Sequence, residues 1–143
     1  MSWGYFDSSV LLKQYVVETG TPPARILFSR YDLVSCAIAP LEITSALARR
    51  RAAGELEARH FLRAVAWIRD DREHWRLIEL SPSVLARAAD VIRETALRTL
   101  DAIHIASCLV FAGGLGTRVP FITADARQRE AAARVHLDVV WVA

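Results

Sequence analysis

Apolar positions along the chain form short runs that alternate with longer segments of helical period. The short runs are rich in aromatic and β-branched residues, which is typical of buried strands; they are Trp3–Phe6, Leu33–Ile38, Arg76–Leu80, Pro120–Thr123 and Val139–Val142. Strands separated by helices indicate right-handed crossovers and a parallel sheet that is covered on both faces. The pattern therefore predicts an α/β fold.

The segments between these strands carry helix signals. After Gly54, one helical face is predicted to be apolar, with Ala58, Phe61, Leu62, Val65 and Ile68. A further helix is expected to begin at Ser81, which can cap it, because Pro82 suits a first turn. Two more helices are expected at Ala102–Phe111, with Thr99 as a possible cap, and at Ala126–Arg134.

Length and composition narrow the class of protein. A chain of 143 residues is predicted to form a single domain spanning residues 1–143, and its hydrophobic share of 53% argues against disorder. A net charge of +2 excludes a polycation that binds any nucleic acid. Lys13 is the only lysine. The arginine bias would suit phosphate binding, but a general preference for arginine is the plainer explanation.

Several features favour a soluble, cytoplasmic protein. Cys36 and Cys108 have no C-x-x-C partner, so they are interpreted as buried thiols in a reducing compartment. No signal peptide is recognisable at the start of the sequence. The longest apolar stretch, Ile105–Leu115, is too short to span a bilayer. We therefore expect no membrane association.

Acidic residues follow the predicted strands at the places where parallel sheets carry their sites. Asp7 ends the first strand, and Glu42 lies in the first turn of the helix after the second strand. Asp101 directly precedes the predicted helix Ala102–Phe111, and Asp125 follows the Phe121–Thr123 strand. Because the carboxyl ends of parallel strands meet at one edge, all four carboxylates are expected to point into one crevice.

Repulsion makes such a grouping informative. Two unit charges about 4 Å apart repel by roughly 4 kcal/mol at an effective dielectric near 20, whereas a helix N-terminus returns only about 0.3–1 kcal/mol to an acid. The group therefore needs protonation or a divalent cation, and oxygen ligands favour Mg²⁺ or Mn²⁺ over zinc. Each acid also has a local interpretation: Asp7 and Asp125 as helix caps, Glu42 as a first-turn acid, and Asp101 as a partner of Arg98.

The segments that carry these acids resemble the PIN-domain family, and specifically its VapC-type toxins. The matching stretches are Tyr5-Phe6-Asp7-Ser8-Ser9-Val10-Leu11-Leu12-Lys13, Leu97-Arg98-Thr99-Leu100-Asp101-Ala102-Ile103-His104-Ile105-Ala106, Phe121-Ile122-Thr123-Ala124-Asp125 and, more weakly, Glu42-Ile43 with Ala46-Leu47. They are spread over nearly the whole chain. The region from Gly54 to Ala96 is generic helical sequence.

The resemblance implies a three-layer fold with a five-stranded parallel sheet flanked by helices. It also implies that Asp7, Glu42, Asp101 and Asp125 form an acidic quartet that binds Mg²⁺ or Mn²⁺. Members of the family cut RNA, are inhibited by a cognate antitoxin and are usually homodimers. Asp125 has no second acid beside it, which is expected to weaken metal binding if relatives use one there.

Cleavage by such a site would be hydrolytic, with the metal activating water and neutralising charge on the phosphate. Ser8, Ser9 and Thr123 are candidates to orient the carboxylates by hydrogen bonds, or else local caps. Candidate phosphate contacts are Arg49, Arg98 and Arg127. Arg49 also fits a helix C-terminus that favours cations, and the other two also fit simple charge balance.

Other signals have plainer interpretations. Asp101 and His104 have the spacing of a carboxylate–histidine metal pair, but His104 is interpreted as a buried structural histidine. Gly113–Gly116 is interpreted as a turn. Trp67 falls off the apolar stripe of its helix, so it suits either a partner surface or a second core contact.

Two alternative functions remain open. A phosphatase that uses Asp7 as nucleophile would require an acid two residues later, where the chain has Ser9. The other alternative is a catalytically weak PIN-fold protein that acts by binding RNA or a partner, with its acids serving as helix caps.

Overall fold

The computed structural model describes all residues, 1–143. The elements follow the predicted alternation of strands and helices. In chain order they are β1 Trp3–Phe6, α1 Ser8–Leu11, η1 Leu12–Gln14, α2 Thr21–Arg30, β2 Asp32–Cys36, α3 Ala39–Ala52, α4 Ala58–Asp71, η2 Arg72–His74, β3 Arg76–Ile78, α5 Pro82–Thr95, α6 Thr99–Leu115, β4 Phe121–Thr123, α7 Ala126–Arg134 and β5 Val139–Trp141.

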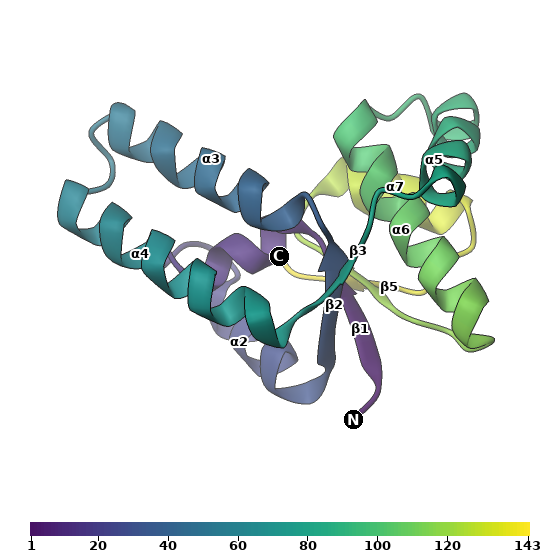
Figure 1. Ribbon diagram of the computed structural model, residues 1–143, viewed down its shortest axis with the longest axis horizontal. Helices are drawn as coiled ribbons and strands as arrows, with labels where there is room; N and C mark the ends of the chain where they lie inside the picture. Colours follow the sequence, from purple (N-terminus) through teal and green to yellow (C-terminus); the bar gives the residue numbers. More distant parts are fainter.

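The five strands form one parallel sheet of order β3-β2-β1-β4-β5. The chain runs outward from β1 to β3 and then returns to the other side of β1, so the strand order reverses between β1 and β4. In Figure 1 the carboxyl ends of the strands point upward, with α3 and α4 on one side and α5, α6 and α7 on the other. The predicted three-layer α/β fold is confirmed.

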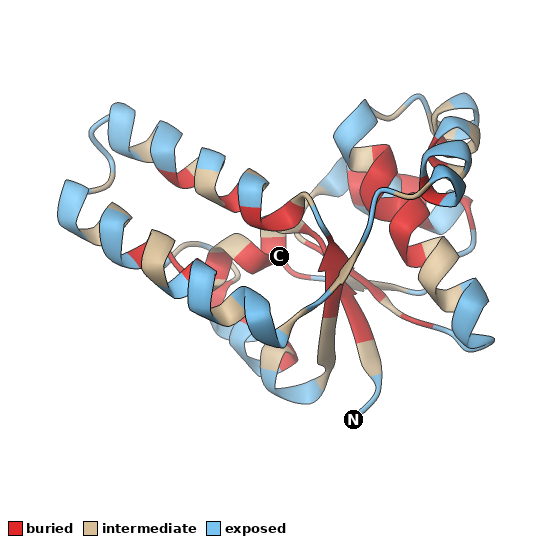
Figure 2. Cartoon of the chain, in the orientation of Figure 1, coloured by how far each residue is buried: buried red, intermediate tan, exposed pale blue.

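Alternation along β1 divides the core between two faces. Tyr5 packs with α5, α6 and α7, whereas its neighbour Phe6 packs with α1, α2, α3 and α4. Figure 2 shows the buried residues concentrated along the sheet and on the helix faces that cover it. Cys36 and Cys108 are both free and buried, as predicted.

Several predicted details of the helices are wrong. On α4 the buried positions are Ala64 and Ile68, while Ala58 and Leu62 are exposed, because only a narrow strip of this helix touches the rest of the molecule. Trp67 is 44% exposed, which agrees with its place off the stripe.

Helix α6 is longer than predicted at both ends. Its N-cap is Arg98, without a side-chain cap, so Thr99 lies inside the helix rather than capping it. Gly113 and Gly114 also lie inside the helix. Only Gly116, with a φ of 68°, ends it in the left-handed conformation that glycine accepts most easily. The predicted turn at Gly113–Gly116 is therefore a helix end.

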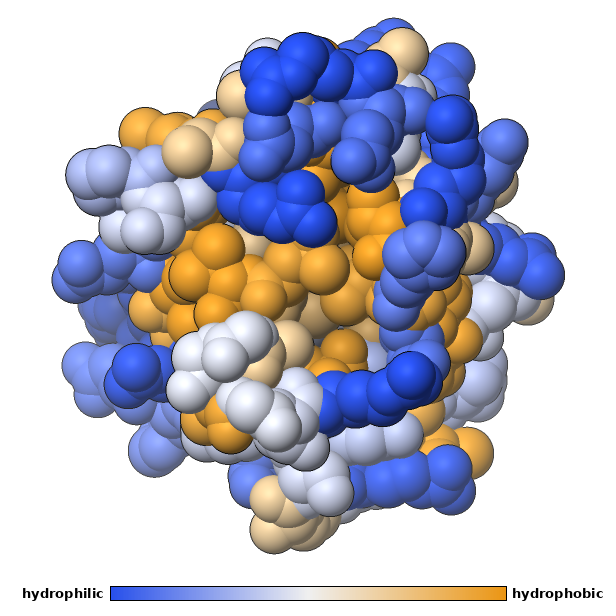
Figure 3. Space-filling view, turned by 90° about the vertical axis from the view of Figure 1, so that its right-hand side faces the viewer, coloured by the Kyte–Doolittle hydropathy of each residue, from blue (hydrophilic) through white to orange (hydrophobic).

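No single helix is long and apolar enough to cross a membrane; α5 and α6 reach that length and composition only together, bent by 117°. Figure 3 shows the face formed by α5, α6 and α7. Apolar residues occupy its centre, and its upper edge, toward the carboxyl ends of the strands, is hydrophilic.

Candidate active site at the carboxyl edge of the sheet

The predicted acids lie at the carboxyl edge of the sheet, close to the reversal of strand order. Asp7 directly follows β1, and Asp125 lies two residues beyond the end of the neighbouring strand β4. Glu42 is in the first turn of α3, and Asp101 is in the first turn of α6. Four elements thus each contribute one carboxylate to the same end of the sheet.

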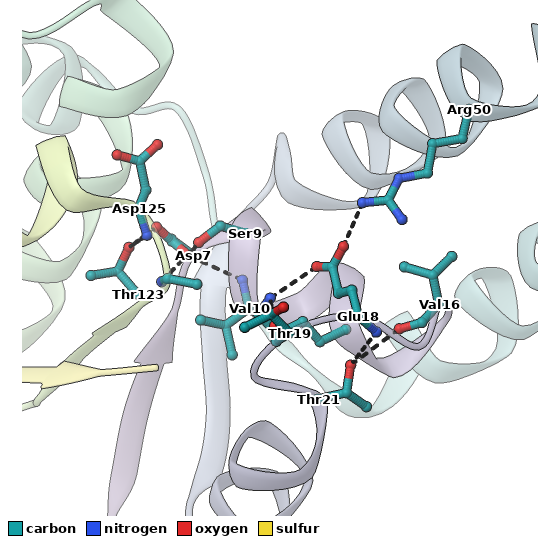
Figure 4. A network of polar contacts seen from close by, with 12 residues as sticks. Asp7, Ser9, Val10, Val16, Glu18, Thr19, Thr21, Arg50, Thr123 and Asp125 are labelled. Atoms are coloured by element: carbon teal, nitrogen blue, oxygen red, sulfur yellow. Dashed lines mark hydrogen bonds and ion pairs between the residues drawn. The ribbon is translucent and has the colours of Figure 1, made fainter. Parts of the chain in front are cut away.

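Asp7 is held tightly. Its carboxylate accepts hydrogen bonds of 2.5 Å from Ser9 Oγ on one oxygen and 2.5 Å from Thr123 Oγ1 on the other. The backbone N–H of Val10 adds a longer bond of 3.3 Å, so the predicted capping role of Asp7 is also real. Figure 4 shows Asp7 enclosed by Ser9, Val10 and Thr123.

Burial dominates the electrostatics of Asp7. The residue is 2% exposed, and this desolvation raises the pKa of its carboxyl group even though His104, Ser9 and Thr123 all favour the charged form. An ionised Asp7 therefore has a higher energy here than in water. A positive charge beside it would relieve that cost.

Glu42 is held by a second set of contacts, from Ser8, which was a predicted candidate for this role, and from His104, which was not. Ser8 Oγ donates to Glu42 Oε1 at 2.6 Å, and His104 Nε2 lies 2.6 Å from the same oxygen. Because an ionised carboxylate only accepts, His104 Nε2 is the donor. His104 Nδ1 in turn lies 2.8 Å from the hydroxyl of Tyr5.

The contacts of Glu42 oppose the effect of its burial. Burial raises the pKa of Glu42, but the hydrogen bond and charge of His104, together with Ser8, outweigh it, and the net pKa is lowered. His104 is 1% exposed. The prediction that it is a buried structural histidine is confirmed, and its structural role is to orient Glu42. Only its helical spacing from Asp101 could have placed it near the acids.

Asp101 and Asp125 are held more loosely. Gln128 Nε2 lies 3.4 Å from Asp101 Oδ1, at the limit of a hydrogen bond, and no ion pair joins Asp101 to Arg98. Asp125 accepts 2.8 Å and 3.2 Å bonds from the backbone N–H groups of Arg127 and Gln128, as a cap of α7. Its carboxylate points away from the sheet (Figure 4).

Among the four acids, Asp101 is the one whose pKa is raised by the charges of the others. Desolvation raises the pKa of Asp101, and the negative charges of Asp125 and Glu42 raise it further, against smaller opposing effects of His104 and Arg98. Neighbouring carboxylates thus repel one another at this edge of the sheet. Such uncompensated negative charge is a common property of sites that act on ligands.

The donor set fits a hard divalent cation, because it consists of carboxylate oxygens and hydroxyls with no thiol. No three carboxylate, histidine or cysteine side chains are arranged close enough to hold one ion between them. Carboxylates brought closer would repel one another by roughly 4 kcal/mol for a pair at 4 Å. A cation of this class would reverse that repulsion.

The arginines predicted to contact phosphate lie in different settings. Arg98 and Arg127 are exposed and line a pocket beside Asp101. Arg49 is exposed on α3, where its Nη1 donates to Ser45 Oγ at 2.7 Å. Its neighbours Arg50 and Arg51 instead contact Glu18 and the ring of Phe61.

The contacts of Glu18 form a separate cluster that does not include the acids above. Glu18 bonds Lys13 at 2.9 Å and Arg50 at 2.5 Å, which ties the segment between η1 and α2 to α3 (Figure 4). Burial raises the pKa of Glu18, but these two cations lower it on balance. Lys13 and Arg50 therefore stabilise the fold through their ion pairs with Glu18.

The parallel α/β fold and the acids at the carboxyl edge of its sheet are the features expected of a PIN domain, and comparison with known families agrees. The model of the PIN domain family matches residues 4–134. The chain therefore belongs to the PIN-domain family.

Individual relatives place the chain more narrowly. It is 34% identical over 109 residues to Ribonuclease VapC45 of Mycobacterium tuberculosis (strain CDC 1551 / Oshkosh), covering 73% of this chain and 74% of that protein. It is 33% identical over 137 residues to Ribonuclease VapC46 of strain ATCC 25618 / H37Rv, covering 95% of both. The predicted membership in the VapC-type ribonucleases is confirmed.

A solved structure supports the fold independently. A chain of a toxin-antitoxin complex from Klebsiella pneumoniae aligns with a TM-score of 0.63 over 96% of this chain and 95% of that one, at 15% identity. At that identity the likeness shows that the whole chain adopts the shared fold.

Proposed function

We propose that this protein is an Mg²⁺- or Mn²⁺-dependent endoribonuclease toxin whose activity depends on Asp7, Glu42, Asp101 and Asp125. The observation that carries the proposal is the presence of four acids from four elements at one edge of a parallel sheet, where the charges of Asp125 and Glu42 act on Asp101. Membership in a family whose curated relatives are named ribonucleases supplies the reaction class.

The side chains of the site have separable tasks. Asp7 and Asp101 provide the central negative charge, and Glu42 and Asp125 bind more peripherally. Ser9 and Thr123 fix the orientation of Asp7, as Ser8 fixes that of Glu42. When bound, the cation supplies the positive charge that offsets charge growing on the phosphate and makes water a better nucleophile at neutral pH.

The substrate in this proposal is held by its phosphates. Arg98 and Arg127 flank Asp101 and Asp125, and Arg49 lies further along α3 from Glu42; all three are exposed. Arginine presents a planar set of donors that matches phosphate oxygens in pairs. His104 stays outside the proton transfers, because it is 1% exposed and its ring contacts Tyr5 and Glu42 inside the protein.

The partners proposed with this function are RNA, a cognate antitoxin and a second copy of the chain. Exposed apolar side chains support a protein partner: Trp67 is 44% and Leu62 is 65% exposed on α4. Exposed aromatic side chains such as Trp67 are enriched where another protein binds. The protein is further proposed to act in the cytoplasm as one domain.

One experiment tests the proposal directly. Wild-type protein is incubated with a mixed RNA pool and Mn²⁺, beside an EDTA control and the Asp7→Asn variant. We expect cutting only by wild-type protein with metal. Cutting that survives in EDTA or in Asp7→Asn would overturn the assignment.

The binding alternative is favoured by one observation, the lack of a ready-made three-ligand metal site. A PIN-fold protein that only binds RNA or a partner would use its acids as helix caps, as Asp7 and Asp125 in part do. Thermal melting separates the two functions. A Mn²⁺-dependent rise in melting temperature that Asp7→Asn abolishes supports the enzyme, and a melting temperature insensitive to Mn²⁺ supports the binding protein.

A further inference from the structure

A pocket of about 270 Å³ opens beside Asp101, between the α5–α6 junction and α7. Its lining is formed by Thr95, Ala96, Leu97, Arg98, Asp101, Arg127, Glu130, Ala131 and Arg134. Asp101 is the one acid of the proposed site that also lines this pocket, so the two are continuous. The pocket thus extends the carboxylate edge along α7.

The three arginines of the pocket are free to bind a ligand. No carboxylate lies within ion-pair distance of Arg98, Arg127 or Arg134, and none of their guanidinium groups donates a hydrogen bond within the protein. Elsewhere arginines on the same surface are paired, as Arg93 is with Asp90 and Arg118 is with Asp138. With Asp101 and Glu130 as its acids, the lining carries one net positive charge.

Helix geometry orders these donors along a line. Arg127 and Arg134 are seven residues apart on α7, so they project from one helix face about 10 Å apart along its axis. Arg127 is beside Asp125 in sequence, and Arg134 lies two turns further from the acids. A chain of phosphates leaving the carboxylate edge would meet these arginines in succession.

The size and lining of the pocket suit one nucleotide. Its volume of about 270 Å³ is just below the roughly 300 Å³ at which pockets for complete small ligands begin. Ala96, Leu97 and Ala131 give it apolar surface for a sugar or base, and the arginines give donors for phosphate. Ala96 has a φ of 57° at the end of α5, a conformation that non-glycine residues hold mainly where surrounding structure imposes it.

We propose that this pocket is a subsite for the nucleotide that neighbours the scissile phosphate of a single-stranded RNA, with Arg134 and Arg127 binding its backbone phosphates. The subsite rests on the proposed ribonuclease function and adds Arg134, which the sequence interpretation did not consider. Unpaired donors continuous with Asp101 favour RNA over an acidic protein segment as the occupant.

The test measures RNA binding without cleavage. A fluorescein-labelled uridine 12-mer is titrated with the full chain in EDTA at several salt concentrations, and fluorescence anisotropy gives the Kd. Arg134→Gln is compared with wild type, with Arg127→Gln and with Arg30→Gln. Arg30 is a matched control, because it is an exposed arginine in the last turn of a helix that leads into a strand, on the other side of the sheet.

We expect Arg134→Gln and Arg127→Gln each to weaken binding about tenfold and to lower the slope of log Kd against log salt by about one. Arg30→Gln should bind as wild type does. Because Arg134 is exposed, folding is not at risk, and Arg134→Lys should keep the salt slope while losing part of the affinity.

Two results would overturn the subsite: equal Kd values for wild type and Arg134→Gln, or equal losses in Arg134→Gln and Arg30→Gln. The first would assign the pocket to an occupant other than RNA. Failure of the ribonuclease proposal is distinguishable. It would appear as no metal-dependent cutting by wild type, while the loss of RNA binding in Arg134→Gln in EDTA would remain.

Discussion

The two halves of the carboxylate edge are built differently. On the side of β1 and α3, Asp7 and Glu42 are fixed by neighbouring hydroxyls and by His104, with bonds of 2.5–2.6 Å. On the side of α6 and α7, Asp101 has a single contact of 3.4 Å and Asp125 bonds only the backbone of its own helix. The first half is fixed by side-chain hydrogen bonds when the chain folds. The second half has few such bonds, so we call it the adjustable half.

The difference shows how a site can combine precisely oriented carboxylates with a high negative charge. A buried carboxylate with several donors keeps one orientation, but its desolvation costs energy. A half-exposed carboxylate costs less and can move when a cation or phosphate arrives. We therefore expect the fixed half to position a cation and the adjustable half to respond to it.

The largest expected effect is on cleavage, where the two halves should behave alike. Asp7→Asn and Asp101→Asn should each lower kcat/KM for RNA by about 1,000-fold or more, because cation stabilisation of the transition state is worth several kcal/mol. The measurement is Mn²⁺-dependent cleavage of one RNA at several enzyme concentrations. Asp90→Asn on α5 is the control and should keep full activity, since Asp90 pairs only with arginines of its own helix.

The next effect probes how Asp7 is held. Thr123→Val keeps the shape of the side chain but removes the hydroxyl that donates to Asp7 Oδ2 and accepts from the Asp125 N–H at 3.0 Å. Mn²⁺ affinity should fall about 10–100-fold, as is usual when a partner of a metal-binding carboxylate is lost. Calorimetric titration with Mn²⁺ measures this change. Thr95→Val, whose hydroxyl bonds only backbone groups near the end of α5, should bind Mn²⁺ normally.

The third effect concerns stability and pH. Because burial raises the pKa of Asp7, the native state binds a proton more tightly than the unfolded state, where aspartate titrates near 3.9. The stability of metal-free protein should therefore fall as pH rises from about 3.9 through the raised pKa, and it should stay lower at neutral pH. Asparagine has no such charge, so Asp7→Asn should melt a few degrees higher than wild type in EDTA at pH 7, at roughly 4 °C per kcal/mol.

Melting curves of both proteins between pH 4 and pH 8 measure this difference. Subtracting the variant from wild type isolates Asp7 from groups that act in the opposite sense, such as Glu42, whose pKa is lowered. The gap should close toward acidic pH, and Mn²⁺ should raise the melting temperature of wild type only. An Asp7→Asn protein less stable than wild type at pH 7 would contradict the claim that burial strains this carboxylate.

The sequence predicted the positions of these acids and named Ser8, Ser9 and Thr123 as candidates to orient them, which all three do by donating hydrogen bonds. It did not predict which hydroxyl holds which acid, or that His104 holds Glu42. Strand runs and helix signals are local patterns, so β1 and α7 were predicted with their observed bounds. Each of the four acids was then located at the end of a predicted strand or the start of a predicted helix. Contacts between distant residues leave no such local pattern. The bond from His104 to Glu42 joins residues 62 apart, and that from Thr123 to Asp7 joins residues 116 apart.

The errors in the helices have two physical origins. Leu62 is apolar and in phase with the stripe of α4, yet it is exposed, because burial depends on which neighbour is present and not on periodicity alone. Gly113 and Gly114 indicated a turn, but both are exposed positions inside α6. Glycine costs a helix only about 1 kcal/mol relative to alanine, so it does not by itself end one.

The smallest expected effect tests the adjustable half at its one contact. Gln128 is 2% exposed, its Nε2 lies 3.4 Å from Asp101 Oδ1, and its Oε1 has no hydrogen-bond partner. Gln128→Leu keeps the volume and removes both polar atoms. Mn²⁺ affinity should change by no more than about threefold, since a contact of that length is weak. Removing an unpaired buried oxygen should leave stability equal or higher. Calorimetric titration and melting in EDTA measure the two quantities. A loss of tenfold or more in Mn²⁺ affinity would show that Asp101 is positioned as firmly as Asp7, and the contrast between the two halves would be wrong.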